Sequence, residues 1–229
     1  MFDLADKPKQ GMFPMMDGAV VGQLYPELMV RGTIPSPLVA IIGTRQPSSE
    51  AAEAAFTVAK LLARAGIGVV SGLALGIDAA AHRGCLAGGG RTVAVLGHGL
   101  DAPLYPPQHT ALAETIAQRG ALVSPFFAQT PTSRQTLLAR NAWIARLATA
   151  VWVVQTGVPG GALAAAAHAR QLGIPVFTTP WQDAHWALGY QALVSRDAEM
   201  VDVLTVINRL KGCCTSEASP RAQQGVLAL

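Results

Sequence analysis

The residues best suited to chemistry in this chain are arginines in a stretch that has no acidic residues. Between Glu114 and Asp183 there is no Asp or Glu, and the basic residues there are Arg119, Arg134, Arg140, Arg146 and Arg170. A segment without carboxylates has little use for general acid–base catalysis. Guanidinium groups and backbone N–H groups are well suited to holding phosphates. The stretch therefore indicates an anionic ligand.

Overall composition is consistent with such a ligand but does not identify it. The net charge is +3, and the 17 basic residues are mostly arginine. This bias favours bidentate phosphate contacts, although the base composition of a GC-rich genome produces it equally well. A length of 229 residues with 51% hydrophobic residues predicts one α/β domain with a substantial core.

The cysteines and the N-terminus bear on location. Cys85, Cys213 and Cys214 make neither a disulfide framework nor a metal-site spacing, which is typical of a reducing cytoplasm. No signal-peptide pattern and no run of 18 apolar residues occurs. We expect a cytoplasmic protein that does not enter a membrane.

Short apolar runs bounded by turn residues alternate with helical patterns along most of the chain. This alternation predicts an α/β fold with a doubly wound, mostly parallel sheet, helices on both faces, and a ligand crevice at the carboxyl ends of the strands. We expect an irregular lead-in over 1–36, a ligand-binding domain over 37–210 that ends in a helix at 198–210, and a flexible tail over 211–229. The expected strands are 38–42, 68–71, 92–96, 121–124, 150–155 and 175–178, and the expected helices before the last one are 50–65, 78–87, 110–119, 133–147 and 161–171.

Each expected strand is followed by small or polar residues. Glycines let a ligand approach the main chain, hydroxyl and N–H groups donate to phosphate oxygens, and a helix N-terminus adds a positive dipole end. A single such loop is explained equally well by a tight turn, but several on one rim favour a binding site. The loops are Gly43-Thr44-Arg45, Ser71-Gly72, Gly97-His98-Gly99, Gln155-Thr156-Gly157 and Pro159-Gly160-Gly161.

These motifs are similar to those of the DprA/Smf family of DNA-processing proteins. In order along the chain stand GTR at 43–45, SGLA at 71–74, GID at 76–78, AVLG at 94–97 and YP at 105–106, and Arg140-Asn141 resembles the start of the family's FPxRNRII segment. The resemblance extends over about 24–210. It implies an extended Rossmann-like fold, binding of single-stranded DNA without catalysis, a homodimer, and a role in loading a RecA-type recombinase during natural transformation.

The resemblance also implies a set of site residues. Arg45 would contact phosphate, Arg140 and Asn141 would line the opposite wall, and Asp78 and His82 would hold their helix in place. Aromatic stacking on bases would add to phosphate contacts, and Phe126 and Phe127 are the candidates for it. The expected DNA- or phosphate-binding residues are Gly43, Thr44, Arg45, Ser71, Gly72, Gly97, Gly99, Arg140, Asn141, Gly160 and Gly161; none is expected to be catalytic, and no metal or cofactor is expected.

The chain also departs from the family pattern. Ala142 replaces the second arginine after Arg140-Asn141, Gln155 replaces an acidic residue at a strand end, and the loop over 180–186 is shortened. These changes remove one cation and carboxylates from the expected binding region, which leaves the size of the ligand open.

A nucleotide is the alternative ligand. Pro159-Gly160-Gly161 resembles the start of the PGGxGTxxE motif of lysine-decarboxylase-like phosphoribohydrolases, but Ala167 stands where the catalytic Glu would be. Hydrolysis is therefore not expected, whereas a SLOG-type nucleotide-binding or sensing protein remains the rival prediction. A third reading is a regulatory partner that has lost its ligand, against which the retention of Arg45 argues.

Overall fold

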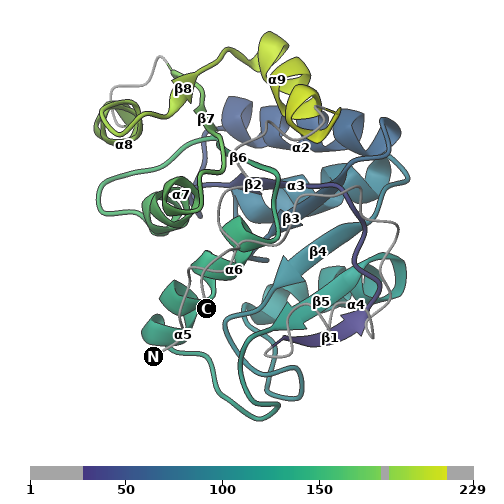
Figure 1. The fold of residues 1–229 in the computed structure, drawn as a ribbon. Helices are drawn as coiled ribbons and strands as arrows, with labels where there is room; N and C mark the ends of the chain where they lie inside the picture. Colours follow the sequence, from purple (N-terminus) through teal and green to yellow (C-terminus); the bar gives the residue numbers. More distant parts are fainter. Residues whose placement is uncertain (1–27, 182–185, 216–229) are drawn as a thin grey trace, which may run out of the picture.

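The chain folds around one twisted sheet with helices on both faces (Figure 1). This architecture is seen in a computed structural model, which describes residues 28–181 and 186–215. Within those residues the sheet has eight strands in the order β1-β5-β4-β3-β2-β6-β7-β8, and only the edge strand β1 is antiparallel to its neighbour. The predicted Rossmann-like, mostly parallel α/β fold is confirmed.

The elements follow one another with short connections. The strands are β1 (Met29–Gly32), β2 (Leu38–Ile42), β3 (Gly68–Ser71), β4 (Thr92–Val95), β5 (Ala121–Ser124), β6 (Ala150–Val153), β7 (Val176–Thr178) and β8 (Glu199–Met200). The helices are α2 (Ser49–Arg64), α3 (Ile77–Ala87), α4 (Thr110–Arg119), α5 (Arg134–Ala139), α6 (Asn141–Arg146), α7 (Gly161–Gln171), α8 (Ala187–Val194) and α9 (Val203–Thr215), with a 3-10 turn η1 (Pro107–His109).

Strand β2 lies where the winding of the sheet reverses. The chain first adds β3, β4 and β5 on one side of β2 and then returns to add β6, β7 and β8 on the other. Strand β2 pairs with β6 from Val39 opposite Ala150 to Ile42 opposite Val153. In sheets of this kind a crevice opens beyond the carboxyl ends of the strands at the reversal. A site is therefore expected beyond Ile42 and Val153.

Alternate residues of β2 point into two different cores. Ala40 and Ile42 pack with α6 and α7 on one face, whereas Val39 and Ile41 pack with α2, α3 and α9 on the other. All five β2 residues are buried, as expected for a central parallel strand covered on both faces. Helices on both faces thus fix the position of the loop that follows Ile42.

The structure differs from the sequence prediction at several places, and one of them is helix α8, where no helix was expected. The lead-in contains a strand, β1, which pairs with β5. The helix expected over 133–147 is two helices, α5 and α6, joined at Arg140. The helix expected over 198–210 is also wrong at both ends. Glu199 and Met200 form β8, and α9 runs from Val203 to Thr215 into the expected tail.

The cap of α9 explains its true start. The Asp202 carboxylate accepts the N–H groups of Leu204 and Thr205, both at 2.8 Å, which is the contact that an N-cap residue makes. The rest of the predicted lead-in and tail, 1–27 and 216–229, lies outside the described residues. Within the described part of the chain, no helix combines the length and apolar character that a membrane crossing requires.

Candidate functional site

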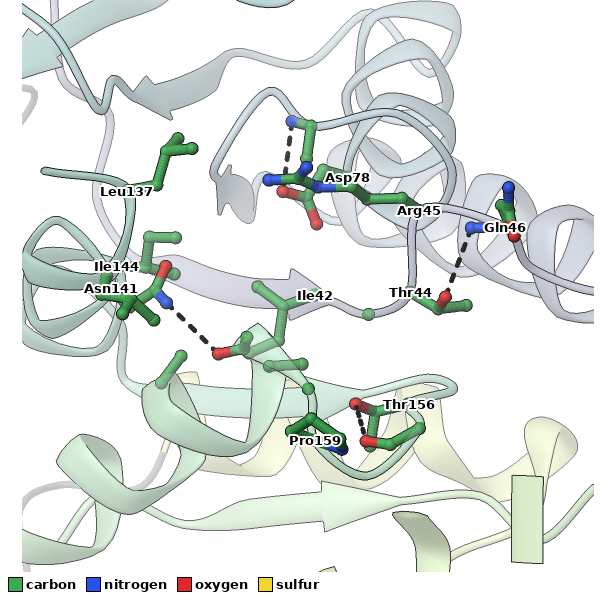
Figure 2. Close-up of a pocket in the computed structure, with 18 of the residues that line it drawn as sticks. Ile42, Thr44, Arg45, Gln46, Asp78, Leu137, Asn141, Ile144, Thr156 and Pro159 are labelled. Atoms are coloured by element: carbon green, nitrogen blue, oxygen red, sulfur yellow. Dashed lines mark hydrogen bonds between the residues drawn. The ribbon is translucent and has the colours of Figure 1, made fainter. Parts of the chain in front are cut away.

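A cavity of about 760 Å³ opens beyond the carboxyl ends of β2 and β6 (Figure 2). Its lining comes from five parts of the fold: the end of β2 with the loop after it, the loop after β3 with the first turn of α3, helices α5 and α6, the loop and first turns of α7, and the residue before α8. Seven of the expected site residues line it, namely Gly43, Thr44, Arg45, Arg140, Asn141, Gly160 and Gly161. The cavity therefore lies where the reversal of the sheet predicts a ligand crevice.

The walls of this pocket differ in polarity. Figure 2 shows Leu137 and Ile144 on one side and Thr44 and Arg45 on the other, with Ile42 between them. Among the described lining residues Asp78 is the single carboxylate. The pocket thus offers an apolar surface facing a polar, cationic one. That combination suits a ligand with an anionic part and a flat apolar part.

Arg45 stands at the mouth of the pocket with its side chain exposed. It forms no salt bridge with another residue of the described ranges. Its charge is felt inside the pocket: burial lowers the pKa of the Arg140 guanidinium, Asp78 opposes that shift, and Arg45 adds a smaller lowering. Arg134, also exposed, lines the same pocket from the first residue of α5. Two exposed arginines that line one pocket favour an anionic ligand there.

Gln155 joins the loop after β2 to the loop after β6. The Thr44 N–H donates to the Gln155 carbonyl at 2.7 Å, and the Ser48 N–H donates to the Gln155 side-chain oxygen at 2.9 Å. The Gln155 amide in turn donates to the Ser48 hydroxyl at 3.2 Å. A carboxylate could accept the first side-chain bond but could not donate the second. The departure from the family's acidic residue thus has a structural role here.

Arg140 is placed differently from the sequence prediction. It was expected to contact phosphate, but the side chain is buried and its Nη1 donates to the carbonyls of Gly72 and Val95. Its Nε donates to Asn141 Oδ1 at 3.0 Å. The guanidinium is thus directed at the main chain beneath the pocket, where it donates to carbonyls at the ends of β3 and β4.

Asp78 and His82 hold α3 against its neighbours, in keeping with the structural role expected for them. The Asp78 carboxylate accepts the N–H groups of Gly72 at 3.1 Å and Ala74 at 3.3 Å. Burial raises the pKa of Asp78, and the charge of Arg140 opposes that shift. His82 Nδ1 lies 2.7 Å from the Thr92 hydroxyl, which itself donates to the Val69 carbonyl, so His82 is the donor.

Four other expected site residues do not line the pocket. The Ser71 hydroxyl donates to the Ile41 carbonyl at 2.7 Å, inside the sheet. A Cβ added at Gly72 would lie 2.2 Å from Arg140 Nη1, one at Gly97 would lie 2.7 Å from a Leu137 methyl, and one at Gly99 would lie 2.1 Å from the Phe127 carbonyl. Close packing, rather than access for a ligand, accounts for these glycines. Phe126 and Phe127 are also outside the lining, with Phe127 91% exposed.

Comparison with known proteins identifies the family. A model of the family described as DNA recombination-mediator protein A matches residues 20–211. The chain belongs to this family. It is 39% identical over 175 residues to Protein Smf of Synechocystis, covering 75% of this chain and 42% of that protein. It is 37% identical over 194 residues to a putative DNA processing protein DprA of Mycobacterium tuberculosis, covering 82% and 50%.

The chain therefore spans about half the length of these curated relatives. Among solved structures it resembles DNA processing protein A from Helicobacter pylori, described for its single-stranded DNA binding mode, with a TM-score of 0.73 and 28% identity over 80% of this chain and 86% of that one. DprA from Streptococcus pneumoniae gives a TM-score of 0.71 and 29% identity over 80% and 66%. A molybdenum cofactor carrier protein from Chlamydomonas reinhardtii, at 19% identity and a TM-score of 0.54, shares the fold.

Sequence reasoning missed several residues that line the pocket of this family member. Arg134 was noted as part of the acid-free stretch but was not assigned to the site. Thr156 and Trp186 line the pocket from the loop after β6 and from the residue before α8. The strand-end position of Thr156 was a usable signal. Trp186 had none stronger than its place near a strand end. Within the described residues, no cluster of three or more His, Cys, Asp or Glu side chains forms a metal site.

Proposed function

We propose that this chain is a DNA-processing protein that binds single-stranded DNA in the pocket between β2 and α7 and performs no chemistry on it. The observation that carries the proposal is Arg45, an exposed guanidinium at the mouth of a partly apolar pocket at the reversal of the sheet. A charged mouth suits a phosphate of the strand, and an apolar wall suits a base or sugar. The single-strand binding described for the Helicobacter pylori relative supports the same ligand class.

The absence of catalysis is argued from the pocket's one described carboxylate. Asp78 already accepts two backbone N–H groups and lies buried beneath Arg140. Hydrolysis of a glycosidic bond needs a positioned acid or base that can reach the substrate. Ala167 occupies the motif position of the Glu, on α7. A pocket of this kind binds its ligand and releases it unchanged.

A mononucleotide is the second candidate ligand. The cavity is concave and its volume of about 760 Å³ is in the range of small-molecule sites. The first turn of α7 begins at Gly161 without a side-chain cap, which leaves N–H groups available to an anion. A SLOG-type nucleotide sensor would use the same residues, so the two candidates are separated by experiment.

The wider role proposed for the chain follows its family. We propose that the bound strand is passed to a RecA-type recombinase in the cytoplasm and that the protein acts as a homodimer. Sedimentation of the purified chain tests the dimer. A strand-exchange assay, in which the protein relieves the delay of a recombinase on strands coated by single-strand-binding protein, tests the loading. A monomer without effect on the recombinase would contradict this part of the proposal.

Titration distinguishes the candidate ligands. Fluorescent oligothymidine, a duplex of equal length and a panel of nucleotides are each added to the protein at several salt concentrations. Single-strand binding should weaken steeply with salt, with a slope of about −0.7 per phosphate contact. Nucleotide binding with a flat salt response would favour the sensor, and binding of neither would refute both.

The variant Arg45→Ala tests the position of the site. We expect single-strand binding to weaken by about 1–3 kcal/mol and the salt slope to become shallower by about one contact, because a charge-assisted phosphate contact is removed. The melting temperature should stay constant, since Arg45 is exposed. Arg119→Ala is the control, because Arg119 is exposed at the end of α4 and does not line the pocket. Equal losses of single-strand binding in the two variants would contradict a site at Arg45.

A further inference from the structure

Trp186 is held against the polar side of the pocket. It is partly buried, directly precedes α8 and lines the cavity. A Cβ added at Gly157 would lie 3.8 Å from Trp186 Cζ3, so an edge of the indole ring lies beside Gly157. Helix α8 approaches the same loop closely, since a Cβ at Gly189 would lie 1.7 Å from the Thr156 carbonyl oxygen. Trp186 and the helix that follows it thus both lie next to the loop after β6.

The loop beside Trp186 is hydrogen-bonded to the loop that carries Arg45. The Thr44 N–H donates to the Gln155 carbonyl at 2.7 Å, one residue before Arg45 and one residue before Thr156. The aromatic ring and the exposed guanidinium therefore come from two directly connected loops. A phosphate and a base are neighbours within one nucleotide unit, so a guanidinium and an aromatic ring on connected loops suit the two groups together.

The remainder of the cavity suits a flat apolar group. Leu137 and Ile144 from α5 and α6, and Ala162 and Ala165 from α7, line it. A phosphate contacted only by arginine and backbone N–H groups has no use for these side chains, because they offer no donor. A base gains from them by burial and from an aromatic ring by stacking. The lining therefore has more apolar surface than phosphate binding alone requires.

We infer that Trp186 is a specificity-determining residue of the pocket, which stacks on a base of the bound strand while Arg45 holds a phosphate. The inference rests on the proposed single-strand binding. Recognition of this kind favours a strand that carries bases over a bare sugar–phosphate strand. The stacking candidates from the sequence, Phe126 and Phe127, lie outside the lining and so give a competing location for the same contact.

The test compares oligothymidine with an abasic oligomer of the same length at fixed salt. Wild type should bind oligothymidine more tightly. Trp186→Ala should weaken oligothymidine binding by about 5- to 150-fold, the range that corresponds to stacking on one base, and should leave the abasic oligomer unchanged. Trp186→Phe should restore most of the preference. Arg45→Ala should weaken both ligands equally, because both carry phosphates.

The other outcomes each decide the matter. Failure of wild type to bind either oligomer overturns the proposed function. Single-strand binding without a preference for bases, or a preference that Phe127→Ala removes and Trp186→Ala leaves, overturns the inference alone. Leu188→Ala is the matched control for disturbance of α8, since that side chain is 67% exposed two residues on and does not line the pocket. Equal loss of both ligands in Trp186→Ala and Leu188→Ala also overturns it.

Discussion

Replacement of Arg140 by Met is expected to destabilise the fold strongly. Met keeps much of the length of the side chain but removes the charge and the donors to the Gly72 and Val95 carbonyls. Asp78 and Arg140 are each 5% exposed, so the variant leaves a buried carboxylate without its compensating cation. Removing one partner of a buried charge pair costs about 3–5 kcal/mol. For a chain of this size that corresponds to a fall in melting temperature of about 6–20 °C.

The pH dependence gives this prediction a second signature. Burial raises the pKa of Asp78, so the stabilisation that comes from its protonated form is present below its unfolded pKa and is lost as pH rises through the folded value. Arg140 opposes that shift. Its removal raises the pKa of Asp78 further and increases the cost of ionisation. The deficit of Arg140→Met should therefore be smaller in acid than at neutral pH.

The assay is urea unfolding across that pH range for Arg140→Met, Asp78→Asn and the double variant. Both side chains bond the main chain of Gly72, and residues in one hydrogen-bond network give coupling energies of about 0.5–3 kcal/mol. The double variant should recover part of the loss because no charge is then buried. A loss below about 1 kcal/mol that does not vary with pH, together with weak single-strand binding, would refute the reasoning. Arg140 would then be the phosphate contact that the sequence predicts.

Three further predictions concern the scaffold. Burial lowers the pKa of His82 to about 3, so the stability it provides above its unfolded pKa of about 6.5 is lost as pH falls toward 3; urea unfolding of His82→Gln should depend less on pH than that of wild type. A Cβ at Gly84 would lie 2.1 Å from the Phe56 carbonyl oxygen, so Gly84→Ala should lose about 1–3 kcal/mol by overpacking. Gly212→Ala on α9, where a Cβ meets nothing within 4 Å, should not lower the free energy of unfolding. Burial raises the pKa of Cys85 to about 12, so iodoacetamide at mild pH should label this thiol only after unfolding, and rapid labelling of the folded protein would contradict its burial.

The central fold could be predicted because its signals are local. The six expected strands coincide closely with β2 to β7, since buried parallel strands are short apolar runs bounded by turn residues. The C-terminal part of the fold was harder to predict. The sequence predicts a single helix over 198–210 that closes the domain, yet within it Met200 and Leu204 are 59% and 86% exposed. The pairing of β8 with β7 decides this region, and sequence periodicity does not report a tertiary contact.

The sequence predicts where the candidate pocket lies, but not which contacts its residues make. The loops at Gly43 and Gly160 could be assigned together, because the carboxyl ends of parallel strands meet at one edge of a sheet. The direction of Arg140 could not, since it depends on carbonyls of β3 and β4 that only the folded chain brings near it. Gly99 is predicted to face a ligand, but it packs against the Phe127 carbonyl, a tertiary contact that the local sequence does not report.

The pairing of β2 with β6 also determines when the pocket can form during synthesis of the chain. Val39 lies opposite Ala150, and the first turns of α7 and then Trp186, which also line the pocket, come later still. Chains leave the ribosome N-terminus first, and pairings between distant segments form slowly. Arg45 is therefore synthesised long before the opposite wall exists. Under the proposed function, a nascent or truncated chain that ends before Trp186 displays the arginine but lacks part of the pocket lining, so we expect strand binding to begin only when synthesis has passed that residue.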